Sequence, residues 1–68
     1  MYNYSKLLGA MKEKGISQDK LALEININPA TLNSKLKNKS QFKQQEMLDI
    51  MRVLSIPPTE IQTYFFVH

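Results

Sequence analysis

Two apolar stripes with the spacing of an α-helix constrain this chain more than any other feature. In each stripe, large apolar side chains recur at i, i+3, i+4 and i+7, which places them on one face of an amphipathic helix. The first stripe is Tyr4, Leu7, Leu8 and Met11, and the second is Met47, Ile50, Met51 and Leu54. We therefore predict helices over about 4–14 and 44–54, each burying its stripe, with Gly15 ending the first.

The chain has 68 residues, no cysteine and a single histidine, the terminal His68. A chain this short encloses one small core, so we expect a single domain spanning 1–68. Without cysteine, the core must hold by packing alone. No stretch approaches the roughly 20 apolar residues that cross a bilayer, and the N-terminus lacks the apolar run of a signal peptide. We expect a cytoplasmic protein.

The segment 17–37 carries the signals of two short helices. Ser17 is a good N-cap for the first, which is predicted to end near Ile25. Asn26 suits the left-handed conformation in which a chain leaves a helix. The side chains predicted to hold this pair of helices together are Leu21, Ala22, Ile25, Ile27 and Leu32.

The second helix of the pair begins where an N-cap residue precedes a proline. Asn28 and Pro29 fill the N-cap and first helical positions. The helix is predicted to run to about Lys37, with Asn38 ending it and 39–41 forming a loop. It has few apolar side chains and no acid.

The C-terminal segment begins with two helix breakers, Pro57 and Pro58. A short fifth helix is predicted over 59–66, with Ile61, Tyr64 and Phe65 as its apolar positions. The last five residues, YFFVH, are equally consistent with an extended tail, because a short apolar run does not distinguish helix from strand. The fold class predicted from these segments is all-α, with five helices.

Positive charge is concentrated in one part of the chain. The net charge is +3, yet no Asp or Glu lies between Glu24 and Glu46. That window holds four lysines, Lys35, Lys37, Lys39 and Lys43. The remainder has five basic and six acidic residues, so the whole positive excess belongs to the window. A local basic surface favours a polyanionic partner, and a solvated lysine-rich face is the alternative.

Two helices joined by a short turn, over 17–37, are typical of a helix-turn-helix. The first helix would hold the second at a fixed angle, so that its polar face enters a major groove roughly 12 Å wide. The small Ala22 would let the two helices approach closely. A carboxylate on the docking face would be repelled by the phosphates, so the lack of acid there favours duplex DNA as the partner.

At these residues the sequence resembles a known family, the lambda-repressor-like DNA-binding domains of phage repressors and Cro proteins. The motif is carried by SQDKLALEININPATLNSKLKNK. The chain is similar, more narrowly, to small Cro-like regulators encoded by prophages of Gram-positive bacteria, through YNYSKLLGAMKEKGISQDKLA and the terminal YFF. The resemblance implies a compact five-helix bundle and a transcriptional regulator, a repressor that occupies operator sites in the bacterial host. Asn26 departs from the usual turn glycine, and Pro29 and Ala30 replace long polar residues.

The resemblance also implies roles for individual residues. Gln18 would meet a phosphate, and Pro29, Ala30 and Ser34 match base-contacting positions. The first two offer only apolar contacts, for example to thymine methyl groups. Lys35 leans toward the core, so its ammonium either reaches a phosphate or pairs internally. The full set expected at the DNA is Gln18, Asn28, Pro29, Ala30, Thr31, Asn33, Ser34, Lys35, Lys37 and Lys39, with Lys43 as a weaker candidate.

Each of these residues also has a purely structural interpretation. Gln18 is a good first-turn residue, and Asn28 is first of all a helix cap. Asn33 and Ser34 could be surface residues without a ligand, and Lys43 a solvated charge.

One small module makes few base contacts, so we expect two copies on half-sites about 34 Å apart. The predicted oligomer is a weak homodimer, or a pair that forms only on DNA. Its candidate interface is Tyr64, Phe66 and Val67, although Tyr64 could instead cover the core. No cofactor, metal ion or small-molecule substrate is expected.

Other functional classes are less well supported by the sequence. No Cys/His or Ser/His/Asp arrangement suggests an enzyme, and Glu46, Asp49 and Arg52 are most simply an exposed charged ridge. The main alternative is a helical protein-binding adaptor or antirepressor with the same fold. A purely structural bundle comes third. RNA binding is disfavoured because aromatic platforms for single strands are lacking.

Overall fold

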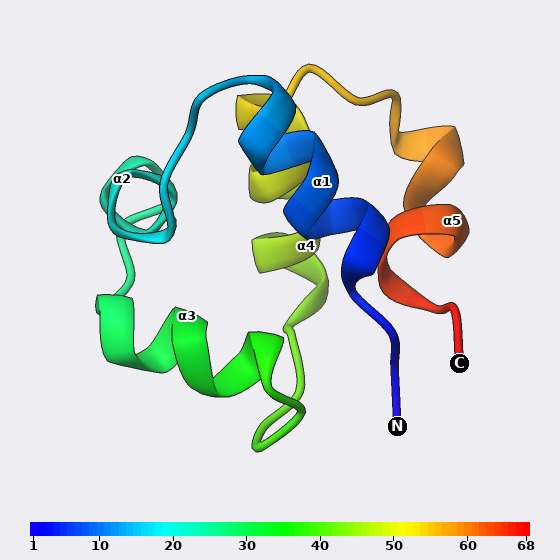
Figure 1. Ribbon diagram of the computed structural model, residues 1–68, viewed down its shortest axis with the longest axis horizontal. Coiled ribbons are helices and arrows are strands. Elements are labelled where there is room, and N and C mark those ends of the chain that lie inside the picture. The colour runs from blue at the N-terminus through cyan, green and yellow to red at the C-terminus, as the bar shows by residue number, and fades with distance from the viewer.

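The computed structural model describes every residue from Met1 to His68. Its helices, in chain order, are α1 (Ser5–Glu13), α2 (Gln18–Glu24), α3 (Pro29–Leu36), α4 (Gln44–Val53), the 3-10 turn η1 (Pro58–Glu60) and α5 (Ile61–Phe65) (Figure 1). There is no strand, so the predicted all-α, five-helix fold class is confirmed. The molecule is nearly isotropic, 25 × 24 × 21 Å. None of the helices has the length and apolar character needed to span a bilayer.

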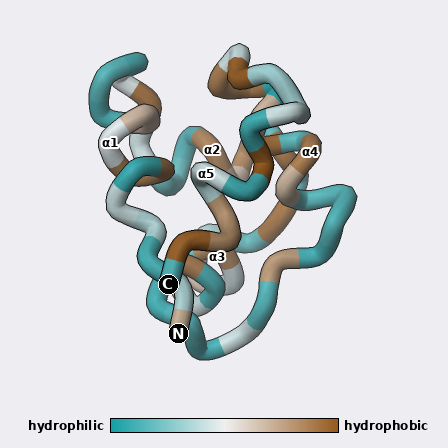
Figure 2. Tube along the Cα trace, turned by 90° about the vertical axis from the view of Figure 1, so that its right-hand side faces the viewer, coloured by the Kyte–Doolittle hydropathy of each residue, from teal (hydrophilic) through white to brown (hydrophobic).

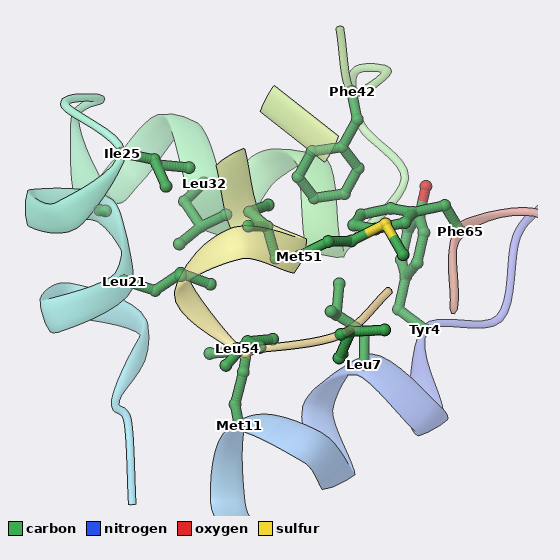
Figure 3. Close-up of a cluster of buried hydrophobic side chains, with 13 residues drawn as sticks. Tyr4, Leu7, Met11, Leu21, Ile25, Leu32, Phe42, Met51, Leu54 and Phe65 are labelled. Carbon is green, nitrogen blue, oxygen red and sulfur yellow. The ribbon is translucent and has the colours of Figure 1, made fainter. Parts of the chain in front are cut away.

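One apolar cluster receives side chains from all five α-helices (Figure 3). Its buried members are Tyr4, Leu7, Met11, Leu21, Ala22, Ile25, Leu32, Phe42, Ile50, Met51, Leu54, Ile56 and Phe65. The prediction that Leu8 is buried with the first stripe is wrong, because Leu8 is exposed. The buried residues here are Tyr4, which precedes α1, and Leu7 and Met11 on α1, with Ala10 packed against the core.

Three aromatic rings close one end of this core. Tyr4 meets Phe42 edge to face at 5.4 Å between ring centroids, and Phe42 meets Phe65 in the same way at 5.3 Å. The C-terminal segment, for which helix and extended tail were both open, is helical as far as Phe65, and the Phe65 side chain is buried in the core. The backbone N–H of Asn3 donates to the carbonyl of Val67, so the two ends of the chain lie together (Figure 1).

Helices α1 to α4 all end in the same way. Each is followed by a residue in the left-handed conformation, in chain order Gly15, Asn26, Asn38 and Ser55. The N–H of the next residue then donates to a carbonyl five positions back, the pattern of a Schellman motif. These bonds are Ile16 to Met11, Ile27 to Ala22, Lys39 to Ser34 and Ile56 to Met51. The predicted roles of Gly15, Asn26 and Asn38 are confirmed.

The residue after the left-handed position distinguishes α3 from the other helices. After α1, α2 and α4 it is an isoleucine, Ile16, Ile27 or Ile56, that packs into or against the core. After α3 it is Lys39, which is exposed. The chain thus leaves α3 toward solvent, into a loop that is hydrophilic along most of its length (Figure 2).

Candidate nucleic-acid interface

Helices α2 and α3 pack against each other, and each has a capped N-terminus. The hydroxyl of Ser17 accepts a hydrogen bond from the backbone N–H of Lys20, at 3.1 Å. The side-chain oxygen of Asn28 accepts one from the N–H of Ala30, at 2.8 Å. Ala22 is completely buried, as expected for a small residue where two helices approach closely. Both predicted caps are confirmed, and they fix where each helix begins.

The outer face of α3 is open to solvent over its first turn. Leu32 is fully buried against the core, whereas Pro29, Ala30 and Thr31 are exposed. Asn33 and Ser34 are half-buried. The first turn of the face that was predicted to meet a partner is therefore uncovered, whereas its middle, at Asn33 and Ser34, is partly covered by other parts of the chain.

A side-chain hydrogen bond joins the start of α2 to the middle of α3. The amide nitrogen Nδ2 of Asn33 donates to Oε1 of Gln18, at 3.2 Å. The bond uses one polar atom of each side chain, so Nε2 of Gln18 and Oδ1 of Asn33 stay available to a ligand. Two of the predicted site residues are thus brought together.

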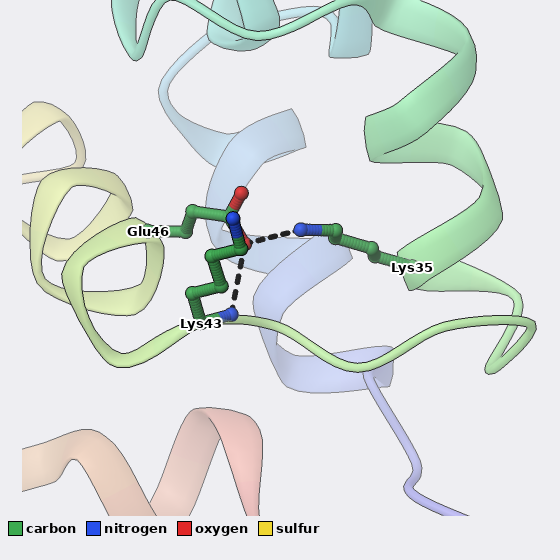
Figure 4. Close-up of polar contacts among 3 residues, drawn as sticks. All are labelled: Lys35, Lys43 and Glu46. Atoms are coloured by element: carbon green, nitrogen blue, oxygen red, sulfur yellow. Dashed lines mark hydrogen bonds and ion pairs between the residues drawn. The ribbon is translucent and has the colours of Figure 1, made fainter.

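Lys35 does not belong to this open face. Its side chain is buried, with a residue exposure of 6%, and its ammonium Nζ pairs with Oε1 of Glu46 on α4 (Figure 4). Of the two alternatives stated for Lys35, the internal pair is the one that forms. The prediction of a DNA contact by Lys35 is corrected accordingly.

Glu46 also holds the start of α4. The same Oε1 atom accepts the backbone N–H of Lys43, the N-cap residue, at 2.8 Å (Figure 4). Burial alone raises the pKa of Glu46, but the hydrogen bonds and positive charges of Lys35 and Lys43 outweigh it and lower this pKa. The carboxylate is therefore charged at neutral pH.

The predicted charged ridge on α4 is only partly correct. Asp49 and Arg52 form an exposed pair at 3.4 Å, as expected for such a ridge. Glu46 belongs instead to the internal pair. A signal in the sequence could have indicated this, because Glu46 is the third residue of α4, where glutamate commonly accepts the N-cap N–H.

The other three lysines of the basic window are exposed and lie in the loop between α3 and α4. They are Lys37, Lys39 and Lys43. The start of this loop is anchored by Asn38, whose Oδ1 accepts the N–H of Tyr2 at 2.9 Å while its Nδ2 donates to the carbonyl of Tyr2 at 2.8 Å. Nothing in the sequence predicted this contact, because it joins residues 36 positions apart.

One exposed apolar residue on α2 was also missed. Leu23 on α2 is 78% exposed, the highest value for a large apolar side chain outside the first residue. It is flanked in sequence by Ala22, which is fully buried. The sequence did contain a signal for Leu23, because it is a large apolar residue at a helical position outside the buried stripe.

The residues predicted for a dimer interface lie at the end of the chain. Tyr64 is half-buried and packs against the core, whereas Phe66 and Val67 are 38% and 39% exposed. The ring of Phe66 meets that of Tyr2 edge to face at 5.7 Å. Tyr64 thus has the core role that was its alternative, and the other two remain on the surface.

No group of three or more His, Cys, Asp and Glu side chains is arranged to hold a metal ion. The polar groups that cluster are the amides of α2 and α3 and the lysines of the loop. Together they could bind a ligand by hydrogen bonds and positive charge.

Comparison with known proteins adds two findings. The model of a family described as "Protein of unknown function (DUF739)" matches residues 1–68. The chain is also similar to the solution structure of the modulator of repression (MOR) of the temperate bacteriophage TP901-1 from Lactococcus lactis. The two are 37% identical with a TM-score of 0.80, over 98% of this chain and 95% of that chain. None of the curated proteins matches the sequence.

Proposed function

The chain belongs to the DUF739 family, and we propose that it is a regulator of transcription that binds duplex DNA sequence-specifically through α3 and the loop after it. In this proposal α2 and α3 act as a helix-turn-helix of the Cro-like kind, α3 enters the major groove, and no reaction is catalysed.

The observation that carries the proposal is the open face of α3. Pro29, Ala30 and Thr31 are exposed on a helix whose opposite side is anchored by Leu32. Small side chains let the backbone of a helix approach base edges closely. Ala30 and the methyl group of Thr31 suit thymine methyl groups, while the hydroxyl of Thr31 and the free amide atoms of Gln18 and Asn33 suit polar base edges or phosphates.

Charge supports the same partner. Lys37, Lys39 and Lys43 are exposed in the loop that follows α3, and no acid lies between Glu24 and Glu46. Ammonium groups beside a docking helix would neutralise phosphates and release counterions. After α1, α2 and α4, an isoleucine at the equivalent position packs on the core. After α3 this position is the exposed Lys39, so the loop faces solvent and is accessible to a ligand.

The similar phage protein is named for an effect on repression, and we extend that role to this chain. A single copy with about three available lysines would bind DNA weakly, since each phosphate contact contributes modestly. We therefore propose two copies on adjacent half-sites, with Phe66 and Val67 as the candidate contact between them.

A second candidate function is binding to another regulatory protein, as an adaptor or antirepressor. The observation that favours it is Leu23, which is 78% exposed on α2. Exposed Pro29 and Ala30 on α3 would add apolar area to such a surface. An apolar contact of this kind suits a protein partner better than a phosphate backbone.

Selection of bound duplexes from a random DNA pool, followed by a salt titration, separates the two functions. DNA binding predicts an enriched sequence and an affinity that falls steeply between about 50 and 200 mM salt. A Leu23→Ala variant should then bind the selected duplex as well as the wild type does. No enriched sequence, together with salt-insensitive and Leu23-dependent binding to a repressor protein, would support the adaptor instead.

A further inference from the structure

Lys35 is the only charged residue among the buried ones. Its side chain is 8% exposed and that of its partner Glu46 is 14% exposed, so both charged groups have lost most of their water. The loss of hydration is unfavourable for each ion, and for buried pairs the attraction between the two charges often does no more than offset it. Such a pair is therefore a poor source of stability, and its effect is better sought in the geometry that it fixes.

The pair joins three segments at one atom. Oε1 of Glu46 receives the Lys35 ammonium from the last turn of α3 and the Lys43 N–H from the end of the loop (Figure 4). Glu46 itself lies in the first turn of α4. One carboxylate oxygen thus sets the end of α3, the end of the loop and the start of α4 relative to one another.

The loop that this atom closes is the one that carries the exposed lysines. Its other end is fixed by the hydrogen bonds between Asn38 and Tyr2 and by the N–H of Lys39, which donates to the carbonyl of Ser34 at 2.9 Å. With both ends fixed, the span of seven residues from Lys37 to Lys43 has little freedom left. The second end is also held by Phe42, which is buried against Tyr4 and Phe65. The contact at Glu46 therefore serves mainly to tie the last turn of α3, and with it the start of the loop, to α4.

We propose that Lys35 and Glu46 are positioning residues, which set the placement of α3 and of the loop 37–43 so that Lys37, Lys39 and Lys43 reach the phosphates while the α3 face meets the bases. They contact no DNA themselves and act through the three lysines. The ligand in this inference rests on the proposed function, whereas the placement of the loop does not. Preorganised charges bind more tightly because less side-chain and loop freedom is lost on binding.

The test compares two double variants of the full chain. Lys35→Met with Glu46→Gln removes the ion pair, yet the Gln carbonyl can still accept the Lys43 N–H. Asp49→Asn with Arg52→Gln is the matched control, because it removes an exposed pair from the same helix. Each double variant leaves the net charge unchanged, so a change in salt dependence cannot come from lost charge.

Two readouts are measured, amide hydrogen exchange and affinity for a selected duplex. In the test variant, the Lys39 amide should exchange about tenfold faster, while the equivalent amide after α4, that of Ile56, stays protected. Affinity should fall about tenfold with a flatter salt dependence, and the thermal midpoint should change by no more than about 5 °C. The control variant should match the wild type in all of these.

The proposal is overturned if Lys39 exchange and DNA affinity in the test variant equal those of the control. If the wild type binds no duplex, the proposed function fails. The exchange rate of the Lys39 amide then tests by itself whether the ion pair sets the placement of the loop. If the test variant does not fold, Glu46→Gln alone is measured, because it keeps an acceptor for both donors. A smaller change of the same sign supports the proposal, and unchanged exchange contradicts it.

Discussion

Ala22 is a small residue of the core. It is completely buried on α2, the helix that packs against α3. Changing Ala22 to Leu should destabilise the chain by about 1–3 kcal/mol, because the extra carbons have no space. Urea unfolding measures this, and Leu23→Ala on the exposed side of α2 should stay within about 0.5 kcal/mol of the wild type. Equal losses for the two variants would show that this contact is not tight.

Asn33 is the residue whose side chain combines a protein contact with a free acceptor. Changing Asn33 to Ala removes the bond to Gln18 and one group available to bases. Discrimination between the selected duplex and single-base variants should fall by up to about 3 kcal/mol at one position. Competition binding measures it, with Gln62→Ala on the exposed side of α5 as the control. A loss that is equal on every sequence would remove Asn33 from base recognition.

A change at Lys37 should affect affinity for all duplexes rather than discrimination between them. Its side chain is exposed at the end of α3, where a phosphate could be met without base contact. Lys37→Gln should weaken binding to all duplexes alike and lower the salt slope by about one unit. Lys6→Gln loses the same charge from the exposed side of α1 and should leave the slope as it was. An equal change in both variants would indicate a general charge effect only.

At the scale of the helices, the sequence was most informative about where each begins and ends. Ser17, Asn28, Gly15, Asn26 and Asn38 have local roles that depend on the residue type and its immediate neighbours. The end of α4 near residue 54 was predicted as well, but from the two prolines at 57 and 58 rather than from a nearer stop. That stop is Ser55, a serine in the left-handed conformation with φ 57°.

Contacts between segments that are far apart in the chain could not be predicted from the sequence. The phase of Lys35 on α3 indicated a position near the core, but not which acid would meet it. The contact of Asn38 with Tyr2 depends on how the N-terminal residues fold back across the molecule. Periodicity therefore predicted the helices and much of the open α3 face, whereas the partners of Lys35 and Asn38 required the packed structure.

Ser55 supports a prediction about the α4 terminus. An L-residue in the left-handed region carries a steric penalty of about 1–2 kcal/mol that glycine avoids. Ser55→Gly should therefore raise the free energy of unfolding by up to about 1 kcal/mol, after the entropy cost of glycine is subtracted. Ser40→Gly, in an exposed bend without positive φ, should give no gain. A destabilised Ser55→Gly chain would mean that its side chain has a role.

For the molecule as a whole, the carboxylate of Glu46 links stability to pH. Its pKa lies below the ordinary value of 4.5 in the folded chain, because the hydrogen bonds and charges of Lys35 and Lys43 outweigh the effect of burial. A depressed folded pKa gives stability that is complete above the unfolded pKa and is lost as pH falls through the folded one.

The free energy of unfolding should therefore fall as pH is lowered through and below the ordinary carboxyl pKa of 4.5. Glu46→Gln has no carboxylate to protonate, so its curve should be flatter across this window. Urea unfolding at a series of pH values measures both, with Asp49→Asn as the control for an exposed acid. Parallel curves for the wild type and Glu46→Gln would show that Glu46 is not the group responsible.

The central claim concerns the whole molecule, namely that the open face of α3 and the lysine loop form the surface for duplex DNA. The most direct measurement is an NMR titration of the labelled chain with a selected duplex, following every backbone amide. The account predicts that the largest shifts fall at the start of α2, along α3 and in 37–43, while α5 stays unaffected. Shifts centred on Leu23 or on the chain ends, with α3 unchanged, would contradict it.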